Sequence, residues 1–262
     1  MKQRRARFWI ACLVIGLGPA LAGFRVASAA GEDTSRPRGL ILISIDTLRP
    51  DHLGPYGYER ATTPHLDRFA ADAIRFETVV AQAPSTLPSH ASLFTSLPPA
   101  LHGALLGRRA ALSSRHVTLA EILKEAGYHT AAFHGGVQMA KRFGLDQGFE
   151  VYEEVNGSFA DTVARATAWI EGHPENDFFL FLHSYAVHHP YTPSKESLAL
   201  LEPAYEGPLP DEISVELLKR INAGEVKISD RDLEHIKNTY DAEIRDMDAA
   251  LERRLAQIEA GN

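Results

Sequence analysis

Cysteine is almost absent from this chain of 262 residues, because the single one, Cys12, lies in an apolar segment near the N-terminus. A disulfide framework is therefore excluded for the rest of the chain, and so is a zinc finger built on cysteine pairs. The sequence also lacks a glycine-rich nucleotide loop and internal repeats. A hydrophobic core must therefore hold the fold together, and 45% apolar residues are ample for one.

Basic residues are also in short supply. The chain has 27 Lys and Arg against 34 Asp and Glu, which gives a formal net charge of −7. General nucleic-acid binding relies on Lys and Arg to neutralise phosphates, so this balance argues against a nucleic-acid partner. An anionic substrate is still compatible with the charge, because a bound metal ion dominates the potential of its own site.

The N-terminus has the composition of a secretory signal peptide over residues 1–29. A basic start precedes an apolar run from Phe8 to Phe24, and Ala27-Ser28-Ala29 offers a small-residue cleavage site. Cleavage would remove five basic residues and no acidic one, moving the net charge from −7 to −12. We therefore predict export to the periplasm or the exterior, followed by a polar linker over 30–38. If the segment is not cleaved, it becomes a membrane anchor instead.

Residues 39–262 alternate between apolar strands and amphipathic helices. We predict strands over 40–47, 128–133 and 177–183, and helices opening at Thr63-Pro64 and over 89–94, 117–126, 159–170 and 230–258. The first of these helices has an apolar face, made of Leu66, Phe69, Ala70, Ala73 and Ile74. This alternation predicts an α/β fold with a mostly parallel sheet. Residues 191–230 contain four prolines, and we predict an irregular insertion near the substrate entrance.

Two polar residues stand where such a fold binds ligands. Asp46 ends the first strand, and ligands bind beyond the carboxyl ends of parallel strands. Thr86 precedes a helix whose N-terminus supplies free N–H groups and partial positive charge to an anion. A carboxylate can hold a divalent metal, and metal coordination can activate a hydroxyl for attack. The simpler alternatives are that Thr86 only caps its helix and that Asp46 only caps a turn.

An ordered set of motifs resembles the N-terminal part of the sulfatase-like division of the alkaline phosphatase superfamily. The motifs are Ile45–Gly54, Thr63–Asp67, Pro84–Thr95, Leu101–Gly103, Gly127–Ala131, Gly148–Glu150, Phe178–Tyr191 and Tyr240–Asp248. The resemblance implies an alkaline-phosphatase-like fold, a mostly parallel sheet flanked by helices, over residues 39–262.

The resemblance also implies roles for individual residues. Thr86 matches the nucleophile, Asp46 matches the first metal-binding aspartate, and His188 matches a histidine that contacts the anionic group of the substrate. Thr86 would be a metal ligand as well, and His183 and His134 are weaker candidates for substrate binding. On the long helix, we expect Asp241, Glu243 and Asp248 to be solvated or structural.

The chain departs from the sulfatase pattern in three places. Thr86 replaces the Cys or Ser that becomes formylglycine, so no formylglycine is expected. His90 replaces the arginine that follows and joins Thr86 and His188 as a catalytic candidate. Thr47 replaces a second aspartate, which favours a single divalent ion, Mn, Mg or Zn, over the calcium of arylsulfatases.

We therefore predict an exported, metal-dependent hydrolase or transferase of phosphate or sulfate esters, acting on a small-molecule or cell-envelope ester. Sulfatase activity proper is an alternative. In the resembled family, a strand after the long helix carries an Asp and a His or Asn that complete the metal site. The given sequence reaches Asn262 without such a strand. The C-terminal part of the domain is thus expected to be missing, which leaves an inactive fragment or anion-binding module as a further alternative.

Overall fold

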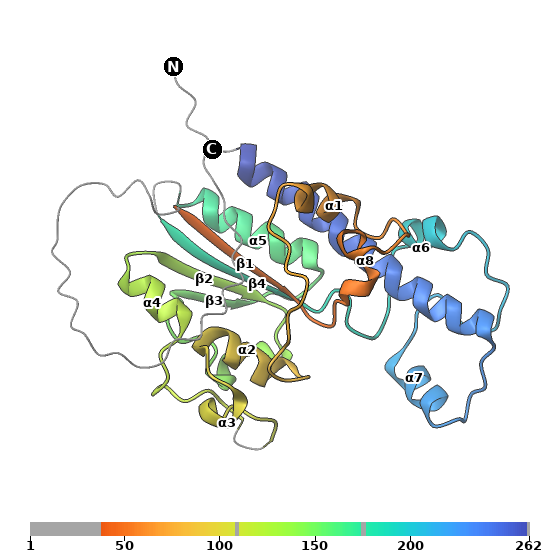
Figure 1. Ribbon diagram of the computed structural model, residues 1–262, viewed down its shortest axis with the longest axis horizontal. Coiled ribbons are helices and arrows are strands. Elements are labelled where there is room, and N and C mark those ends of the chain that lie inside the picture. The colour runs from red at the N-terminus through yellow and green to blue at the C-terminus, as the bar shows by residue number, and fades with distance from the viewer. Residues whose placement is uncertain (1–37, 108–109, 174–176, 261–262) are drawn as a thin grey trace.

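The computed structural model of the protein describes residues 38–107, 110–173 and 177–260, so the predicted signal peptide lies outside the described residues. At its centre is a sheet of four parallel strands in the order β1-β4-β2-β3 (Figure 1). The strands are β1 (Gly39–Ile45), β2 (His129–His134), β3 (Val151–Glu154) and β4 (Phe178–Ser184). The predicted α/β class with a parallel sheet is confirmed. Strand β3 escaped prediction because it is only four residues long and lies at the sheet edge.

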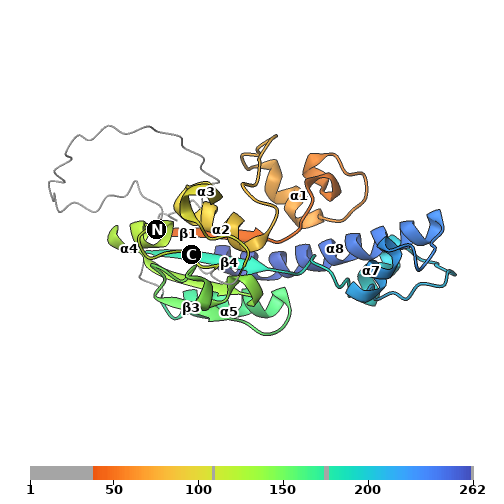
Figure 2. The same cartoon turned by 90° about the horizontal axis from the view of Figure 1, so that it is seen from below.

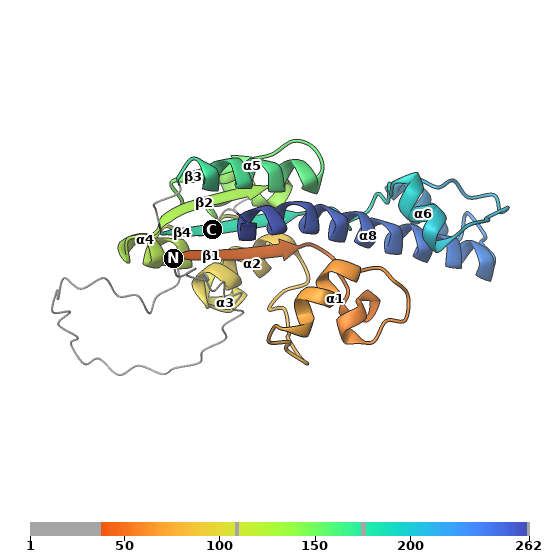
Figure 3. The same cartoon turned by 90° about the horizontal axis from the view of Figure 1, so that it is seen from above.

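Helices cover both faces of the sheet (Figures 2 and 3). They are α1 (Pro64–Ala71), α2 (Thr86–Thr95), α3 (Pro99–His102), α4 (Leu119–Glu125), α5 (Phe159–Glu171), α6 (Lys195–Leu201), α7 (Val215–Asn222) and α8 (Asp230–Ala260). Short 3₁₀ turns cover Pro50–His52, Gly54–Tyr56, Val137–Met139 and Lys141–Phe143. Helices α2 and α4 pack on one face, whereas α5 and α8 pack on the other. None of the helices in the described part of the chain is apolar over a length that could cross a membrane.

Strand β4 shows how one sequence serves both layers. Successive strand side chains point to opposite faces, so an apolar run from end to end suits a strand that is covered twice. Phe179 and Phe181 belong to the core under α2 and α4, while Phe178, Leu180 and Leu182 belong to the core under α5. Each such buried side chain contributes about 2 kcal/mol by leaving water. The same alternation places His183 on the α2 side of the sheet.

The helix starts follow from local capping chemistry. Thr118 caps α4 in a reciprocal pair with the side chain of Glu121. Ser158 and Asp161 form the same capping box at the start of α5. Helix α2 begins at Thr86 itself, three residues earlier than predicted.

The predicted apolar face of α1 is not a core face. No residue of α1 is buried, Phe69 is 44% exposed, and Ile74 lies beyond the helix end and is 74% exposed. Only the start of the helix is anchored, since Leu66 packs into the core beside α8. The periodicity was real, but within the described residues nothing covers that side of the helix.

The prediction of an irregular segment over 191–230 is wrong in part, because the segment contains α6 and α7. Ser194 and Ser214 cap these two helices with their side chains. The prolines lie before and between the helices, where they interrupt neither. The long helix α8 was predicted correctly, and it extends past the sheet with α1 and α6 packed against it (Figure 1).

Candidate active site

Asp46 lies at the carboxyl end of β1 on the α2 side of the sheet. Its N–H bonds the carbonyl of Ser184 at 2.9 Å, which continues the β1–β4 ladder by one residue. Leu40 and Leu42 face the core under α2, so the alternation of the strand brings Ser44 and then Asp46 to that same side. The geometry of β1 therefore delivers the carboxylate to the N-terminus of α2.

The turn after Asp46 is strained and firmly held. Thr47 has φ of 59°, a left-handed conformation that is costly for a β-branched residue. The hydroxyl of Tyr240 on α8 donates to the carbonyl of Thr47 at 2.8 Å, and the Thr47 hydroxyl donates to the carbonyl of Val187 at 2.9 Å. The tertiary structure thus fixes the direction in which Asp46 points.

Thr86 is the first residue of α2, and its hydroxyl donates to Asp46 Oδ2 at 2.6 Å. Among the described residues, no backbone N–H donates to this hydroxyl, so its hydrogen-bond partner is Asp46 rather than the start of its own helix. Burial by itself would raise the pKa of Asp46, but the neighbouring His183 imidazole and Thr86 hydroxyl together hold that pKa below its ordinary value. The carboxylate is ionised at neutral pH and orients the hydroxyl.

His90 lies one turn further along α2, directly beneath Thr86. Its Nδ1 is 2.7 Å from the Thr86 carbonyl, which can only accept, so Nδ1 carries the proton. Its Nε2 then accepts from the Ser44 hydroxyl at 2.8 Å. Burial lowers the pKa of His90 to about 4, which keeps the ring neutral. These contacts give His90 the geometry of a positioning residue.

Three further side chains bring unpartnered polar atoms to the same end of the sheet. His183 is fully buried, neither of its ring nitrogens has a hydrogen-bond partner among the described residues, and its Nε2 lies 3.6 Å from Asp46 Oδ2. His134 Nδ1 accepts from the Gly136 N–H at 3.1 Å, so its Nε2 carries a proton that the described residues do not accept. The buried hydroxyl of Tyr185 is unpartnered in the same sense.

Buried polar atoms are almost always paired in folded proteins, so a group of exceptions needs an explanation. Tyr185 was missed by the sequence reasoning. The signal was present, because Tyr185 follows His183 by two residues and the alternation puts both on one face. The ring of Tyr185 meets the His183 ring edge to face at 4.5 Å.

A cleft of about 990 Å³ joins these groups to α5 and α8. Thr86, His183, Tyr185 and His188 line one part of it, and Glu243, Asp246 and Met247 of α8 line another. His188 is half-buried, and its Nδ1 donates to the His189 carbonyl at 2.8 Å. Asp46, His90 and His134 are not part of the lining. The structure thus assembles Thr86, His183 and His188 at one opening, with Asp46 and His90 behind Thr86.

Asp241, Glu243 and Asp248 of α8 are buried rather than solvated. Asp241 accepts from His52, Tyr58 and Arg60, while Asp248 accepts the backbone N–H groups of His65 and Leu66. These two carboxylates have structural roles. Glu243 differs, since one of its oxygens has no hydrogen-bond partner among the described residues.

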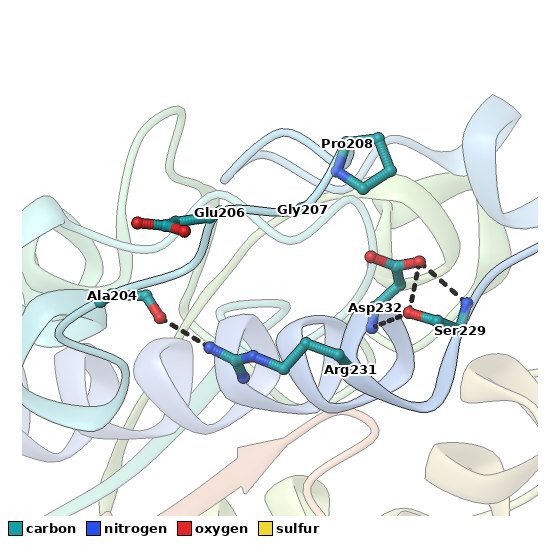
Figure 4. Close-up of a pocket in the computed structure, with 7 residues that line it drawn as sticks. All are labelled: Ala204, Glu206, Gly207, Pro208, Ser229, Arg231 and Asp232. Carbon is teal, nitrogen blue, oxygen red and sulfur yellow. Dashed lines mark hydrogen bonds between the residues drawn. The ribbon is translucent and has the colours of Figure 1, made fainter.

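A second hollow, of about 550 Å³, lies near the start of α8 (Figure 4). Three of its polar side chains, those of Arg231, Ser229 and Asp232, are already hydrogen-bonded (Figure 4). Arg231 donates to the carbonyl of Ala204 at 2.7 Å, and Ser229 and Asp232 form a capping pair at the helix start. We therefore place the candidate site at the cleft beside Thr86.

The donor atoms beside Thr86 fit a divalent metal ion only in part. A carboxylate oxygen, a hydroxyl and an imidazole nitrogen without a partner approach one another at Asp46, Thr86 and His183. These donor types suit a divalent ion, and the unpartnered His183 nitrogens need a ligand. Within the described ranges, no group of three or more His, Cys, Asp or Glu side chains could hold a metal ion. Asp46, Thr86 and His183 therefore suit a divalent ion whose remaining ligands come from the substrate or from water.

The fold is α/β, and its alkaline-phosphatase-like class is shown by the solved structures that share it. The family model described as Sulfatase matches residues 38–262, and the chain belongs to the sulfatase family. It is 37% identical over 110 residues to arylsulfatase A of Homo sapiens, a match that covers 40% of this chain and 22% of that protein.

Solved structures share the fold at low sequence identity. The phosphonate monoester hydrolase of Agrobacterium radiobacter matches with a TM-score of 0.68 at 17% identity, over 87% of this chain and 60% of that one. The C-terminal periplasmic domain of EcEptC from Escherichia coli matches with a TM-score of 0.63 at 18% identity, over 86% and 60%. The chain thus spans only part of the length of these relatives.

Proposed function

We propose that the protein is a metal-dependent hydrolase or transferase of phosphate or sulfate esters, with Thr86 as its nucleophile. The observation that carries the proposal is the 2.6 Å hydrogen bond from the Thr86 hydroxyl to Asp46 Oδ2, at the N-terminus of α2 and on the wall of the cleft. A helix N-terminus attracts an anionic group, so the reacting phosphorus or sulfur atom would lie next to the hydroxyl.

The Thr86 oxygen would attack phosphorus or sulfur while the bond to the leaving alcohol breaks, and Asp46 would take the Thr86 proton. The leaving oxygen would gain a proton from His188 or water. Water or a second alcohol would then attack the covalent ester and restore the Thr86 hydroxyl. The unpartnered His134 Nε2–H, His183 and Tyr185 O–H favour charge stabilisation around the transferred group. His90 would hold the Thr86 backbone in place rather than react.

A divalent ion would be held by Asp46 and Thr86, with His183 as a further ligand. When bound, it supplies Lewis acidity and makes the threonine oxygen more nucleophilic. The mixture of imidazole, hydroxyl and one carboxylate favours zinc or manganese over calcium, which prefers many oxygen ligands. The EcEptC domain has also been solved as a complex with Zn. That structure matches this chain with a TM-score of 0.59 at 16% identity, over 86% of this chain and 60% of that one.

Thr86 at the nucleophile position favours phosphate esters, because formylglycine cannot form from threonine. Sulfate-ester hydrolysis is the second candidate, and the likeness to arylsulfatase A supports it. Export rests on the composition of residues 1–29, and the periplasmic origin of the EcEptC domain is in keeping with it. The substrate would be a small-molecule or cell-envelope ester.

Replacement of the nucleophile tests the proposal. We expect Thr86→Ala to lower turnover of a p-nitrophenyl phosphodiester by at least about 1,000-fold with manganese or zinc present, since the covalent route is lost. Thr86→Ser should retain part of the activity, and Ser85→Ala is the matched control, because Ser85 makes no side-chain capping bond to α2. Unchanged turnover in Thr86→Ala would overturn the proposal. Faster release of sulfate from p-nitrophenyl sulfate would favour the second candidate.

Metal binding is tested separately by titration calorimetry. Stoichiometric binding of manganese or zinc that is lost in Asp46→Ala supports the proposal. If neither ion binds and no ester is turned over, the protein is an anion-binding module or an inactive form.

A further inference from the structure

One acidic side chain that lines the cleft from α8 has a carboxylate oxygen without a hydrogen-bond partner among the described residues. Glu243 is only 6% exposed and lines the cleft from α8. Its Oε1 accepts from the Thr192 N–H at 2.7 Å, whereas its Oε2 is shielded from water and has no hydrogen-bond partner in the part of the chain that the structure describes. An unpartnered buried carboxylate oxygen is costly, so its retention calls for a ligand.

The neighbouring carboxylates on α8 show that this state is unusual. Asp246 accepts three hydrogen bonds, from the N–H and hydroxyl of Ser194 and from the hydroxyl of Ser197. Asp241 and Asp248 are likewise paired on both oxygens. The helix therefore pairs both carboxylate oxygens of Asp241, Asp246 and Asp248, and Glu243, a residue of the cleft lining, is the exception.

The charge of this end of the cleft selects the ligand. Two carboxylates, Glu243 and Asp246, stand in the wall, and no Lys or Arg is among the residues that line the cleft. Burial, with the charge of Asp246 added, raises the pKa of Glu243 to about 8. An ammonium cation would offset the repulsion between the carboxylates of Glu243 and Asp246 and would also donate a hydrogen bond to Oε2. A neutral hydroxyl would supply only the hydrogen bond.

We propose that Glu243 forms a subsite for an ammonium group carried by the alcohol part of the ester substrate. An N–H of the ammonium group donates to Oε2, and the carboxyl group gives up its proton to solvent where it was protonated. Phe159, Met247 and Ala250, which also line the cleft, offer apolar contact to the carbon chain between the two charged ends. This subsite deepens the proposed function and rests on it for the position of the ester.

Matched inert probes test the subsite without any turnover. The probes are ω-aminoalkylphosphonates with two, three or four carbons, each paired with the phosphonate in which a methyl group replaces the ammonium. Titration calorimetry gives the ratio of the two dissociation constants. For at least one length, the wild type should bind the amino probe about tenfold tighter, as expected for a charge-assisted hydrogen bond.

The variant Glu243→Gln keeps the acceptor for Thr192 but removes the charge, so the ratio should fall to near one. Glu234→Gln, on the exposed side of the same helix, makes the same change of charge and should leave the ratio intact. A ratio near one in the wild type at every length, or an unchanged ratio in Glu243→Gln, would overturn the subsite. So would an equal gain from hydroxyalkylphosphonates.

Proton release gives a second measurement. Calorimetry at pH 7.5 in buffers of different ionisation enthalpy gives the number of protons that the amino probe releases beyond its methyl partner. This difference should be larger in the wild type than in Glu243→Gln, and an equal difference in the two proteins contradicts the proposal. Thr86→Ala should keep the binding ratio, so failure of the proposed chemistry and failure of the subsite give different results.

Discussion

Two buried polar regions of this molecule have opposite hydrogen-bonding states. Around Asp241, below the surface turn at 50–60, the carboxylate accepts from His52, Tyr58 and Arg60 at 2.6–2.9 Å. At the carboxyl edge of the sheet, His183 is just as deeply buried and has no hydrogen bond to either ring nitrogen in the described chain. The first arrangement is complete by itself, whereas the second lacks a partner.

The difference separates structural from functional burial. A paired carboxylate fastens segments that are distant in sequence, here α8 to the region after β1. An unpaired polar group adds no stability, so its presence points to a ligand that completes it. Both regions contain histidine and aspartate, and residue types alone do not distinguish them.

The largest expected effect comes from breaking the complete region. Asp241→Ala leaves Arg60, Tyr58 and His52 without their common acceptor, and we expect the free energy of unfolding to fall by about 3–5 kcal/mol. Urea denaturation of the purified protein measures this. Glu234→Ala, which removes an exposed acid of the same helix that is 3.8 Å from Arg60, should cost less than about 1 kcal/mol. Equal losses in the two variants would contradict the assignment.

Acid should act through the neutral histidines of the other region. Burial lowers the pKa of both His90 and His134 to about 4, against an ordinary value of 6.5. Between these values the unfolded chain binds the proton and the folded one does not, so stability is present above pH 6.5 and is lost as the pH falls toward 4. Protonation of each histidine should lower the free energy of unfolding by about 3 kcal/mol between pH 6.5 and pH 4. The loss over this range should be smaller in His134→Gln than in the wild type, as measured by urea titrations at several pH values.

Glu243 should show the reverse dependence on pH. Its pKa is raised to about 8 in the folded state from an ordinary 4.5, so the folded protein holds a proton that the unfolded chain has released. Stability is full below pH 4.5 and declines as the pH rises to 8. Glu243→Gln should therefore stabilise the protein by about 4–5 kcal/mol at pH 8.5 and by almost nothing at pH 4.5. Thermal melts at the two pH values check the sign, and equal shifts at both would contradict it.

The smallest change in stability should accompany one of the largest losses of activity. His183→Phe replaces an unpartnered ring by an apolar one of similar shape, so the free energy of unfolding should stay within about 1 kcal/mol of the wild type. Turnover of the phosphodiester should fall by about 100-fold, as a transition-state contact is lost. A variant whose free energy of unfolding falls by several kcal/mol, but whose folded fraction keeps the wild-type turnover, would place His183 with the structural histidines instead.

The strands and helices were largely readable in the sequence. The strands predicted over 40–47 and 177–183 and the helix predicted over 230–258 all correspond to observed elements, because each depends on contacts within a few residues. Asp46 and Thr86 were likewise marked by their places, one after a strand and one at a helix start. The short strand β3 was missed because four residues at a sheet edge carry little local signal. The helices α6 and α7 were missed although Ser194 and Ser214 cap them, because the prolines of the segment favoured an irregular structure.

Which polar groups are paired was decided only by the tertiary structure. Asp241 and Glu243 are two residues apart on one helix, yet the first meets three donors from the segment after β1 and the second meets the cleft. The convergence of His183 with Asp46 and Thr86 depends on the pairing of β1 with β4 and on the packing of α2 above them. Such contacts join residues between 40 and 189 positions apart, and local patterns carry no information about them. The sequence by itself therefore determined the elements and the chemistry available at their ends, while the packing determined which of those groups remain free to bind a substrate.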